Sequence, residues 1–549
     1  MSHKPSVLII GLDGAGFALL DPWFEAGELP ALAGLVRRGS RSVLRSTPQP
    51  VSAPAWTTVL TGKNPGKHGV FGFGRPRRSD YRPEVVNSTH CRAQTLWQVV
   101  NRHGLRAGAI GVPMTYPPQV IDGFLIAGFD APTKGQPVAS PTEVLALFRQ
   151  EVGEDYVHTL PPMGPDQAVP WDAVERPTRH TTLAAKLLSE RYSPDVLMAV
   201  YSAGDHIQHA YWQRRKARHA EGGESQDVLL DTYRMLDAQV GELLAEVCGL
   251  DTQVIVMSDH GAGPTTRQLN IDNWLAAEGF LVRRGSDGAG MTVKHRAAFL
   301  ARRAARKILG GKLSDTLSGR FEEQRKELAR DMAVAGVDFS QTQVFATDSF
   351  GSLRLNIVGR EALGALEAPD RGAVEAKITR ALLGIRDPET GEQVISQVVK
   401  GPDLYHGPYT DEGPDLIAVP TGYRYVLRTN MVHSIAGLGA LENSQIWEPA
   451  PYGEHNPEGI LIVAGNAVKS GGATDVANLQ DIAPTVLHLL GLPVPEDMDG
   501  HPLTDLLAGG EEVQHEAAPE DAAPEHELAA YTDEEQAEVE ERLRNLGYM

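Results

Sequence analysis

The sequence predicts an α/β fold in which a mostly parallel central sheet carries helices on both faces. Several short runs of Val, Ile and Leu end abruptly in Gly, Asp or Ser, which is typical of buried parallel strands whose carboxyl ends meet a cleft. Helix-like segments alternate with these runs, as an α/β layered fold requires. The expected strands are 7–12, 107–112, 124–127, 196–201, 253–257 and 460–464, and the expected helices include 93–101, 181–189 and 228–248.

The chain has 549 residues, more than one hydrophobic core usually spans, so a large domain with an insertion is expected. We assign 1–280 and 398–508 to a discontinuous core. We assign 281–397 to an inserted cap, because the pattern changes there to helix-like stretches such as the basic, Ala-rich 294–307 and the following 313–337. The acidic segment 509–530 is expected to be a flexible linker. A terminal helix within 531–549 is predicted from the capping box of Thr532 and Glu535.

The charge balance bears on the class of partner. The net charge is −20, but thirteen acidic residues and two arginines from position 510 onward account for −11 of it, which leaves −9 for the rest of the chain. An acidic chain of this kind argues against a nucleic acid as a stable partner, because phosphate backbones are held by clustered Lys and Arg. It does not argue against a small phosphorylated substrate drawn to metal ions.

The compartment is inferred from cysteines and apolar runs. Cys91 and Cys248 are too few for a disulfide framework in a chain of this length. The apolar run near the start, 7–12, is shorter than a signal-peptide core or a membrane span. We therefore expect a cytoplasmic protein without a membrane span, and the sequence leaves its oligomeric state open.

Carboxylates follow three of the expected strands. Asp13 follows 7–12 and precedes Gly14, which permits a tight turn, while Asp205 follows 196–201. Asp259 and His260 follow 253–257 and precede a glycine. In folds of this class, ligands collect beyond the carboxyl ends of the strands. A helix cap or a turn is an ordinary alternative for each carboxylate, and only their shared position predicts a site.

Three further residues join these candidates. Asp205 and His209 are spaced i and i+4, which puts both on one face of a helical turn, where they can grip one metal ion; His206 points elsewhere and is left out. Ser52 precedes a helical turn whose positive end favours an alkoxide or a phosphate, although serine is also a preferred helix cap. His455 precedes the last expected strand and, by itself, is only a loop histidine.

The order of these motifs resembles the alkaline phosphatase superfamily and, within it, the type I phosphodiesterases and nucleotide pyrophosphatases. Each motif is weak alone, but the ordered set is specific, and the resemblance extends from about 6 to 506. The motifs are Asp13-Gly14, Ser52 followed by Pro54, Thr61-Gly62, His68-Gly69, Asp205 with His209, Asp259-His260-Gly261, His455, and the stretches 481–491 and 495–500.

The resemblance implies an alkaline phosphatase-like fold with two divalent metal ions. One ion would be surrounded by Asp13, Ser52, Asp259 and His260, and the other would be held by Asp205, His209 and His455. Ser52 would be the nucleophile and would form a phosphoseryl intermediate. Zn is the usual metal of this branch and suits imidazole with carboxylate, and Mn, which occurs in the related phosphoglycerate mutases, stays open as the alternative.

The sequence also departs from the family pattern. The usual nucleophile is Thr, and an Asn that helps to hold the phosphoryl oxygens follows the His-Gly motif, whereas this chain has Ser52 and Phe73 at these places. These differences put nucleotide specificity in doubt. Lys63, Asn64 and Lys67 are candidates for the missing donor, although a solvated loop is the more ordinary explanation of each. Trp56 replaces the Arg of the similar formylglycine sulfatases, which argues against that chemistry.

These features lead us to expect a two-metal hydrolase of phosphodiester or pyrophosphate bonds. Because no Arg lies beside Ser52, the extra charge of a phosphomonoester would not be met, and a diester is favoured. Distal anionic groups could bind the basic insertion or four nearby arginines: Arg75, Arg77, Arg78 and Arg82. A solvated or acid-paired surface is the more ordinary explanation of these residues. The alternatives are a phosphomonoesterase or a mutase of the same superfamily, and a non-catalytic binding protein that presents its terminal helix to a partner.

Overall fold

The computed structural model describes most of the chain. The predicted helix at 294–307 and nearly all of the one at 313–337 lie outside the described residues. The described residues are 3–135, 137–214, 227–284, 336–429, 445–450, 452–472, 476–510, 512–518, 531–546 and 548.

A nine-stranded, mostly parallel sheet forms the centre of the larger lobe, with strand order β20-β2-β19-β9-β1-β8-β5-β6-β7. All six predicted strands are present in it. Both neighbours of β1, which are β8 and β9, run parallel to it. The strands are β1 (Val7–Leu12), β2 (Ser40–Arg45), β5 (Ala107–Val112), β6 (Gly123–Ala127), β7 (Ala139–Ser140), β8 (Val196–Tyr201), β9 (Gln253–Met257), β19 (Glu458–Ala464) and β20 (Ala477–Asn478).

One predicted strand runs in the opposite direction. The expectation of a parallel strand at 460–464 is wrong, because β19 pairs antiparallel with both β9 and β2. Its Leu461 lies opposite Met257 and its Ala464 opposite Val254, so the chain enters β19 at the edge where β9 ends. That edge is where the chain returns from the smaller lobe, and this return fixes the direction of β19.

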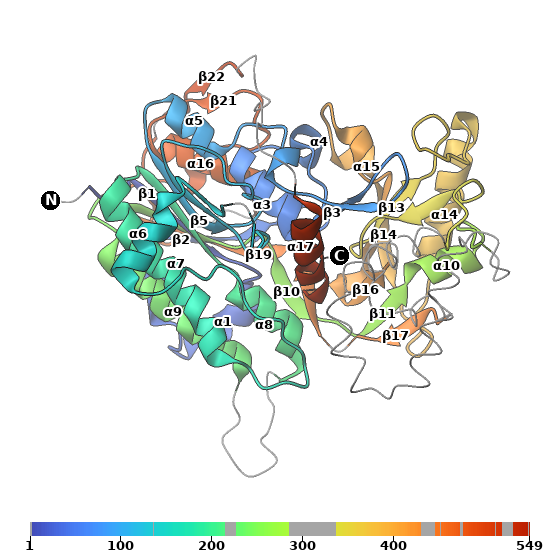
Figure 1. Cartoon of the computed structure of the whole chain (residues 1–549), viewed down its shortest axis with the longest axis horizontal. Coiled ribbons are helices and arrows are strands. Elements are labelled where there is room, and N and C mark those ends of the chain that lie inside the picture. The colour runs from blue at the N-terminus through green and yellow to red at the C-terminus, as the bar shows by residue number, and fades with distance from the viewer. Residues whose placement is uncertain are drawn as a thin grey trace, which may run out of the picture.

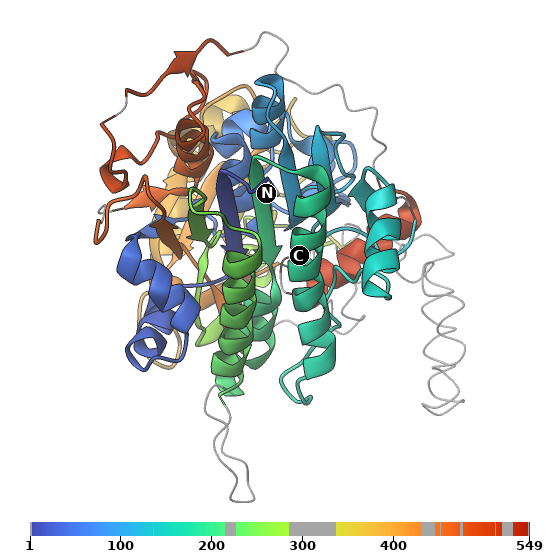
Figure 2. The ribbon, with the colours of Figure 1, turned by 90° about the vertical axis from the view of Figure 1, so that its left-hand side faces the viewer.

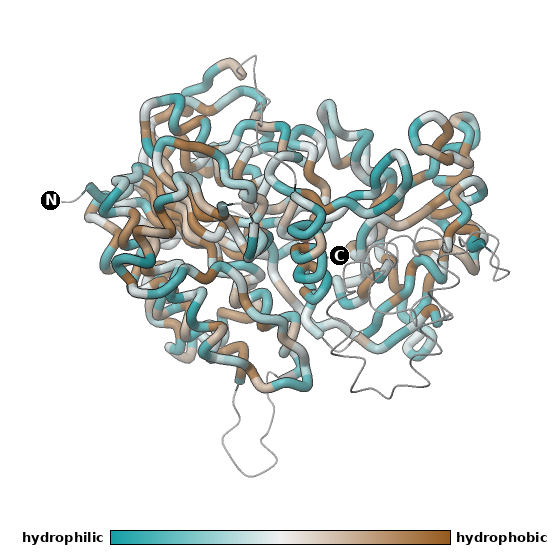
Figure 3. Tube along the Cα trace, viewed as in Figure 1, coloured by the Kyte–Doolittle hydropathy of each residue, from teal (hydrophilic) through white to brown (hydrophobic). Residues whose placement is uncertain are grey.

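Helices cover both faces of the sheet, as predicted. Leu8 and Ile10 of β1 pack into one apolar core, and Val7 and Ile9 pack into the other. Figure 2 shows α7 and α9 side by side on the first face, and the strands form the most apolar part of this lobe in Figure 3. The first face carries α1 (Phe17–Glu25), α2 (Pro30–Arg38), α6 (Glu143–Val152), α7 (Trp171–Tyr192), α8 (Ala203–Tyr211) and α9 (Val228–Glu246); the second carries α3 (Ser52–Thr61), α5 (Leu96–Arg102) and α16 (Ile482–Leu489), and α4 (Pro65–His68) follows α3.

The smaller lobe has an apolar core of its own, to which Leu269, Phe339, Ile378 and Leu416 contribute. Its four-stranded sheet joins strands from inside 281–397 with strands beyond it. The sheet does not separate the two parts at 397, and the domain division there stays a prediction. Its elements are β11 (Arg267–Asn270), α10 (Ile271–Ala277), β12 (Val344–Ala346), β13 (Ser352–Leu355), α14 (Arg371–Leu383), β14 (Ile395–Lys400), α15 (Gly401–Leu404), β15 (Leu416–Pro420), β16 (Tyr425–Arg428) and β17 (Trp447–Pro449).

A two-stranded ribbon, β10 (Gly261–Pro264) with β18 (Gly453–Asn456), runs between the lobes (Figure 1). The terminal helix is α17 (Asp533–Asn545). The helix begins at the predicted Thr532–Glu535 capping box. In the predicted flexible linker, His515–Glu516 instead forms strand β22, which pairs with β21 (Val494–Pro495). The remaining pair is β3 (Gly74–Pro76) with β4 (Pro83–Val85). Among the described helices, none is both long and apolar enough to cross a membrane.

Candidate active site

The candidate residues meet beyond the carboxyl ends of β1, β8 and β9. Gly14, at a φ of +73°, turns the chain sharply after Asp13. A methyl group at Gly14 would lie 3.0 Å from Asp205 Oδ1, so the glycine also lets the start of α8 approach β1 closely. This close approach brings residues that are 192 positions apart in the chain into one site.

We use the name first ligand group for the four residues that are expected to surround one metal ion, Asp13, Asp259, His260 and Ser52. His260 Nε2 lies 3.3 Å from Asp259 Oδ2, 3.7 Å from Asp13 Oδ1 and 3.2 Å from Ser52 Oγ. Asp259 and His260 are adjacent, and both reach the site because β9 has already ended at Met257. Ser52 is fully buried and is the first residue of α3, so it lies at the positive end of that helix.

We use the name second ligand group for the three residues that are expected to hold the other metal ion, Asp205, His209 and His455. Asp205 Oδ1 lies 3.4 Å from His209 Nε2 and 3.3 Å from His455 Nε2, and the two imidazole nitrogens are 2.8 Å apart. The i, i+4 spacing on α8 does place Asp205 and His209 together. His455 lies on strand β18 rather than in a loop.

Hydrogen bonds to backbone carbonyls orient two of the imidazoles. His455 Nδ1 donates to the Pro50 carbonyl oxygen at 2.6 Å, and His260 Nδ1 donates to the Gly261 carbonyl oxygen at 3.1 Å. A carbonyl oxygen can only accept, so each ring carries its proton on Nδ1 and turns the Nε2 lone pair toward the site. The two rings stack with centroids 3.6 Å apart, and the two ligand groups are therefore continuous.

The two groups have opposite electrostatics. Burial, reinforced by the neighbouring carboxylates, raises the pKa of Asp13 well above its ordinary value, and burial also raises the pKa of Asp259. Burial would raise the pKa of Asp205 too, but His209 and His455 overcome it and hold that pKa well below its ordinary value. For His209, burial opposes the charge, yet Asp205 raises the pKa to about 9.

The donor set fits divalent cations. Asp13 Oδ1, Asp205 Oδ1 and Asp259 Oδ2 are buried and have no hydrogen-bond partner among the described residues. Asp205 Oδ1 has the charge of His209 beside it, whereas the burial of the other two oxygens is costly unless a cation lies beside them. Carboxylate oxygens with imidazole nitrogens are also the ligands that Zn prefers. The sequence interpretation missed Glu454, whose carboxylate lies close enough to His209 and His455 to share an ion with them. Its place next to His455 was the available signal.

A second residue that the sequence interpretation missed is Tyr548, which follows α17. Its hydroxyl group donates a hydrogen bond to Asp205 Oδ2. Burial raises the pKa of Tyr548 well above its ordinary value, so the hydroxyl group keeps its proton. Its ring packs 5.0 Å from the ring of Phe73, centroid to centroid, and 5.4 Å from that of His455.

The terminal helix is docked on the core through one of its faces. Arg542 Nη1 donates to the Phe129 carbonyl oxygen at 2.7 Å, and Tyr116 donates to Glu535 at 3.0 Å. Val539 and Leu543 are fully buried against an apolar cluster that contains Phe73. No signal in the sequence connected this helix with the ligand groups.

The candidates for a donor that replaces the expected Asn bind elsewhere. Lys63 pairs with Asp497, and Lys67 and Asn64 both bind the Asp499 carboxylate. These groups hold the turn at 497–499, so the expectation that one of them serves the site is wrong. The four nearby arginines contact acidic partners or backbone oxygen: Arg75 with Glu84, Arg77 and Arg82 with Asp80, and Arg78 with the Asp411 carbonyl.

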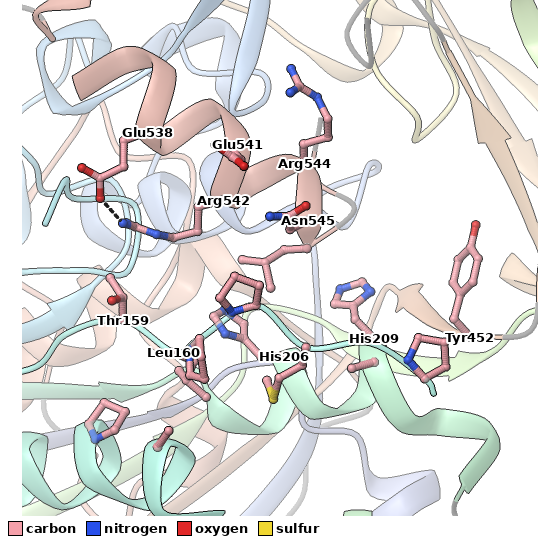
Figure 4. A pocket seen from close by; sticks show the side chains of 18 of the residues that line it. Thr159, Leu160, His206, His209, Tyr452, Glu538, Glu541, Arg542, Arg544 and Asn545 are labelled. Carbon is pink, nitrogen blue, oxygen red and sulfur yellow. Dashed lines mark hydrogen bonds and ion pairs between the residues drawn. The ribbon is translucent and has the colours of Figure 1, made fainter. Parts of the chain in front are cut away.

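A cavity of about 800 Å³ opens on the second ligand group (Figure 4). Its floor is α8, from which His206 and His209 face it, and one wall is the carboxyl end of α17 with Arg544, Asn545 and Leu546. A further wall is formed largely by the segment 157–165 and α7, where apolar side chains lie beside Asp172 and Arg176. We call this cavity the chamber.

Comparisons with known proteins agree with this architecture. Residues 7–426 match the family model described as type I phosphodiesterase / nucleotide pyrophosphatase. A solved structure of phosphonoacetate hydrolase from Sinorhizobium meliloti 1021, in complex with phosphonoformate, is similar with a TM-score of 0.50 at 14% sequence identity, over 88% of this chain and 94% of that one. At this identity the likeness concerns the fold alone, and it agrees with the predicted alkaline phosphatase-like architecture.

A shorter match concerns a 2,3-bisphosphoglycerate-independent phosphoglycerate mutase from Laribacter hongkongensis (strain HLHK9), which is 48% identical over 59 residues. That stretch is 11% of this chain, and the chain spans only 9% of the mutase's length. The family model, in contrast, covers most of the chain and includes every candidate ligand except Glu454 and His455. The chain belongs to the type I phosphodiesterase / nucleotide pyrophosphatase family.

Proposed function

We propose that this protein is a metal-dependent hydrolase of phosphodiester or pyrophosphate bonds that acts through a phosphoseryl intermediate on Ser52. One observation carries the proposal: three buried carboxylates, three imidazoles and one serine hydroxyl group converge at the edge of the sheet, and three of their carboxylate oxygens lack a hydrogen-bond partner among the described residues. Asp13, Asp259, His260 and Ser52 would hold one cation. Asp205, His209 and His455 would hold the other, with Glu454 in reach.

The chemistry divides between the cations and the chain. Two divalent cations would supply positive charge for the attacking and leaving oxygens of an in-line displacement. Ser52 Oγ attacks phosphorus and forms the new P–O bond as the bond to the leaving alcohol or phosphate breaks, and the serine proton leaves with the departing group. Water then cleaves the phosphoserine and restores the hydroxyl group. The helix α3 directs its positive end at Ser52 throughout.

The diester preference rests on what the site lacks. Among the described residues, no arginine contacts Ser52. A phosphomonoester would bring a dianionic group that needs more positive charge. Zn is the metal we favour from the donor set, with Mn as the alternative.

The proposal is tested by Ser52→Ala. We expect turnover of bis-p-nitrophenyl phosphate to fall by at least about a thousandfold, while metal content, measured by mass spectrometry of the purified protein, stays at the wild-type level. Wild-type protein that hydrolyses p-nitrophenyl phosphate faster than the diester would favour the phosphatase or mutase alternative. Substantial activity in the Ala variant would refute the assigned role of Ser52.

A further inference from the structure

Part of the chamber wall can receive an apolar group, because it consists of Leu160, Pro161, Met163 and Pro177. Four arginines also line the chamber. Three of them are paired with glutamates, and the fourth is Arg428: the pairs are Arg176 with Glu154, Arg542 with Glu538 and Arg544 with Glu540. A volume of about 800 Å³ lies within the range of small-molecule sites, which combine apolar walls with a few polar groups.

A buried histidine supplies such a polar group. His206 faces the chamber, is only 2% exposed, and neither of its ring nitrogens has a hydrogen-bond partner among the described residues. A neutral imidazole offers one donor and one acceptor, and leaving both unused in a buried position is costly. The sequence interpretation set His206 aside because it lies on a different face of α8 from Asp205 and His209.

The position of the chamber identifies which part of a substrate it receives. It opens at His209 and Glu454, which belong to the second ligand group, and not at Ser52. In an in-line displacement the nucleophile and the leaving group lie on opposite sides of phosphorus. If the ester is attacked by Ser52, the group that reaches the chamber is the departing alcohol.

We propose that the chamber binds the leaving group of the ester, and that this leaving group is an alcohol with a large apolar body whose polar atoms meet His206. The inference rests on the proposed function for the identity of the attacked bond. Ser52 Oγ displaces this alcohol, which departs with the serine proton, and water releases the smaller monoester from Ser52.

Methyl octyl phosphate tests the inference within one molecule, because its two ester bonds to primary alcohols have similar intrinsic reactivity. We expect the metal-loaded enzyme to release octanol and methyl phosphate at least about tenfold faster than methanol and octyl phosphate, since burying two methylenes already accounts for such a factor. Products are quantified by mass spectrometry. Equal amounts of the two product pairs, or an excess of methanol, would overturn the inference.

Matched variants assign the preference to the chamber. Met163→Asp places a charge on the apolar wall and should remove most of the bias toward octanol. Leu250→Asp makes the same kind of change at a leucine that is 99% exposed, and it should leave the bias intact. A bias that survives Met163→Asp would contradict the assignment.

A failure of the proposed function would be recognised separately. If the wild-type enzyme cleaves no diester, the proposed function is wrong. Calorimetric binding of octyl phosphate and methyl phosphate to the metal-loaded Ser52→Ala protein still tests whether the chamber binds an apolar group. Octyl phosphate should bind at least about tenfold more tightly. Equal affinities would exclude an apolar group from the chamber whatever the reaction.

A different observation supports a second inference, which concerns Tyr548. The Asp205 carboxylate has two distinct oxygens: Oδ1 faces His209 and His455, and Oδ2 accepts the hydrogen bond from the Tyr548 hydroxyl group. A hydrogen bond to the outer oxygen of a ligating carboxylate fixes which oxygen faces the metal. The docked helix α17 holds the tyrosine in place.

We infer that Tyr548 is a positioning residue for the cation held by Asp205, His209 and His455. Its hydroxyl group orients Asp205, and its ring, packed on Phe73 and Phe129, excludes water from that side of the ligand group. The terminal helix is then part of the active site, although it is more than 300 residues away from Asp205 in the chain.

Calorimetric titration of the metal-free protein with Zn²⁺ tests this role without any measurement of activity. Tyr548→Phe keeps the ring and removes the hydroxyl group, and we expect it to weaken one of the two binding events by about tenfold or more while the other is unchanged. Deletion of residues 548 and 549 leaves α17 intact and should weaken the same event. Wild-type affinity for both ions in both variants would overturn the role.

Tyr531→Phe is the control, because its hydroxyl group donates to the Asp130 carbonyl oxygen at 3.1 Å, in the same terminal segment but away from the ligands. It should bind both ions as the wild-type protein does. Equal weakening in Tyr531→Phe and Tyr548→Phe would show that loosening of the terminal segment, and not the contact with Asp205, is responsible.

Discussion

The two ligand groups meet at one edge of the sheet but differ in charge. The Asp13 group has two carboxylates and one imidazole, and its buried acids have raised pKa values. The Asp205 group has one carboxylate and two imidazoles, and it is compensated internally, with the pKa of Asp205 lowered and that of His209 raised to about 9. The first group needs an external cation to be ionised, whereas the second is already a buried ion pair.

They differ in construction as well. The first group comes from residues that directly follow β1 and β9, together with the first residue of α3, so its geometry is fixed by neighbouring strands. The second takes its ligands from α8 and the β10–β18 ribbon, and Tyr548 contacts it from the end of the chain. The first group is therefore built by adjacent strands, whereas the second depends on contacts between segments that are far apart in the chain.

Replacing one carboxylate in each group should separate them. Asp13→Asn and Asp205→Asn are both expected to lower turnover by at least about a thousandfold. Their effects on metal-free stability should have opposite signs. Asp13→Asn removes an uncompensated buried acid and should raise the melting temperature, while Asp205→Asn strips two imidazoles of their partner and should cost about 3 kcal/mol of unfolding free energy. Calorimetric melting in the presence of a chelator measures the stability of both variants without metal. Shifts of the melting temperature in the same direction would contradict the proposed difference between the two groups.

The pH dependence of stability gives a smaller effect. In the unfolded chain His209 titrates near 6.5, and in the folded protein its pKa is about 9. A raised histidine pKa contributes stability below pH 6.5 that is lost as the pH rises toward 9. Metal-free protein should therefore melt at progressively lower temperature across this interval, and His209→Gln should flatten the profile. A melting temperature that rises over the same interval would contradict the internal ion pair.

Much of the fold could be predicted from local patterns. The strand at 7–12 and the helix at 228–248 are visible because apolar periodicity and capping residues act over a few positions, and both occur in the structure. The direction of β19 could not be predicted in this way. The direction depends on where the chain re-enters the sheet after the smaller lobe. A run of apolar residues is the same in parallel and antiparallel strands, so the pattern does not show the direction.

The sequence by itself determined the identity and order of the candidate ligands, since Asp13, Asp205 and Asp259 follow recognisable strands and α8 displays its acid and imidazole on one face. Only the tertiary structure decided that His455 faces them, that Phe73 is covered by an aromatic ring, and that Tyr548 reaches Asp205. The physical reason is the distance along the chain over which each kind of signal acts. Strand and helix signals act between near neighbours, whereas the docking of α17 depends on buried contacts between residues hundreds of positions apart.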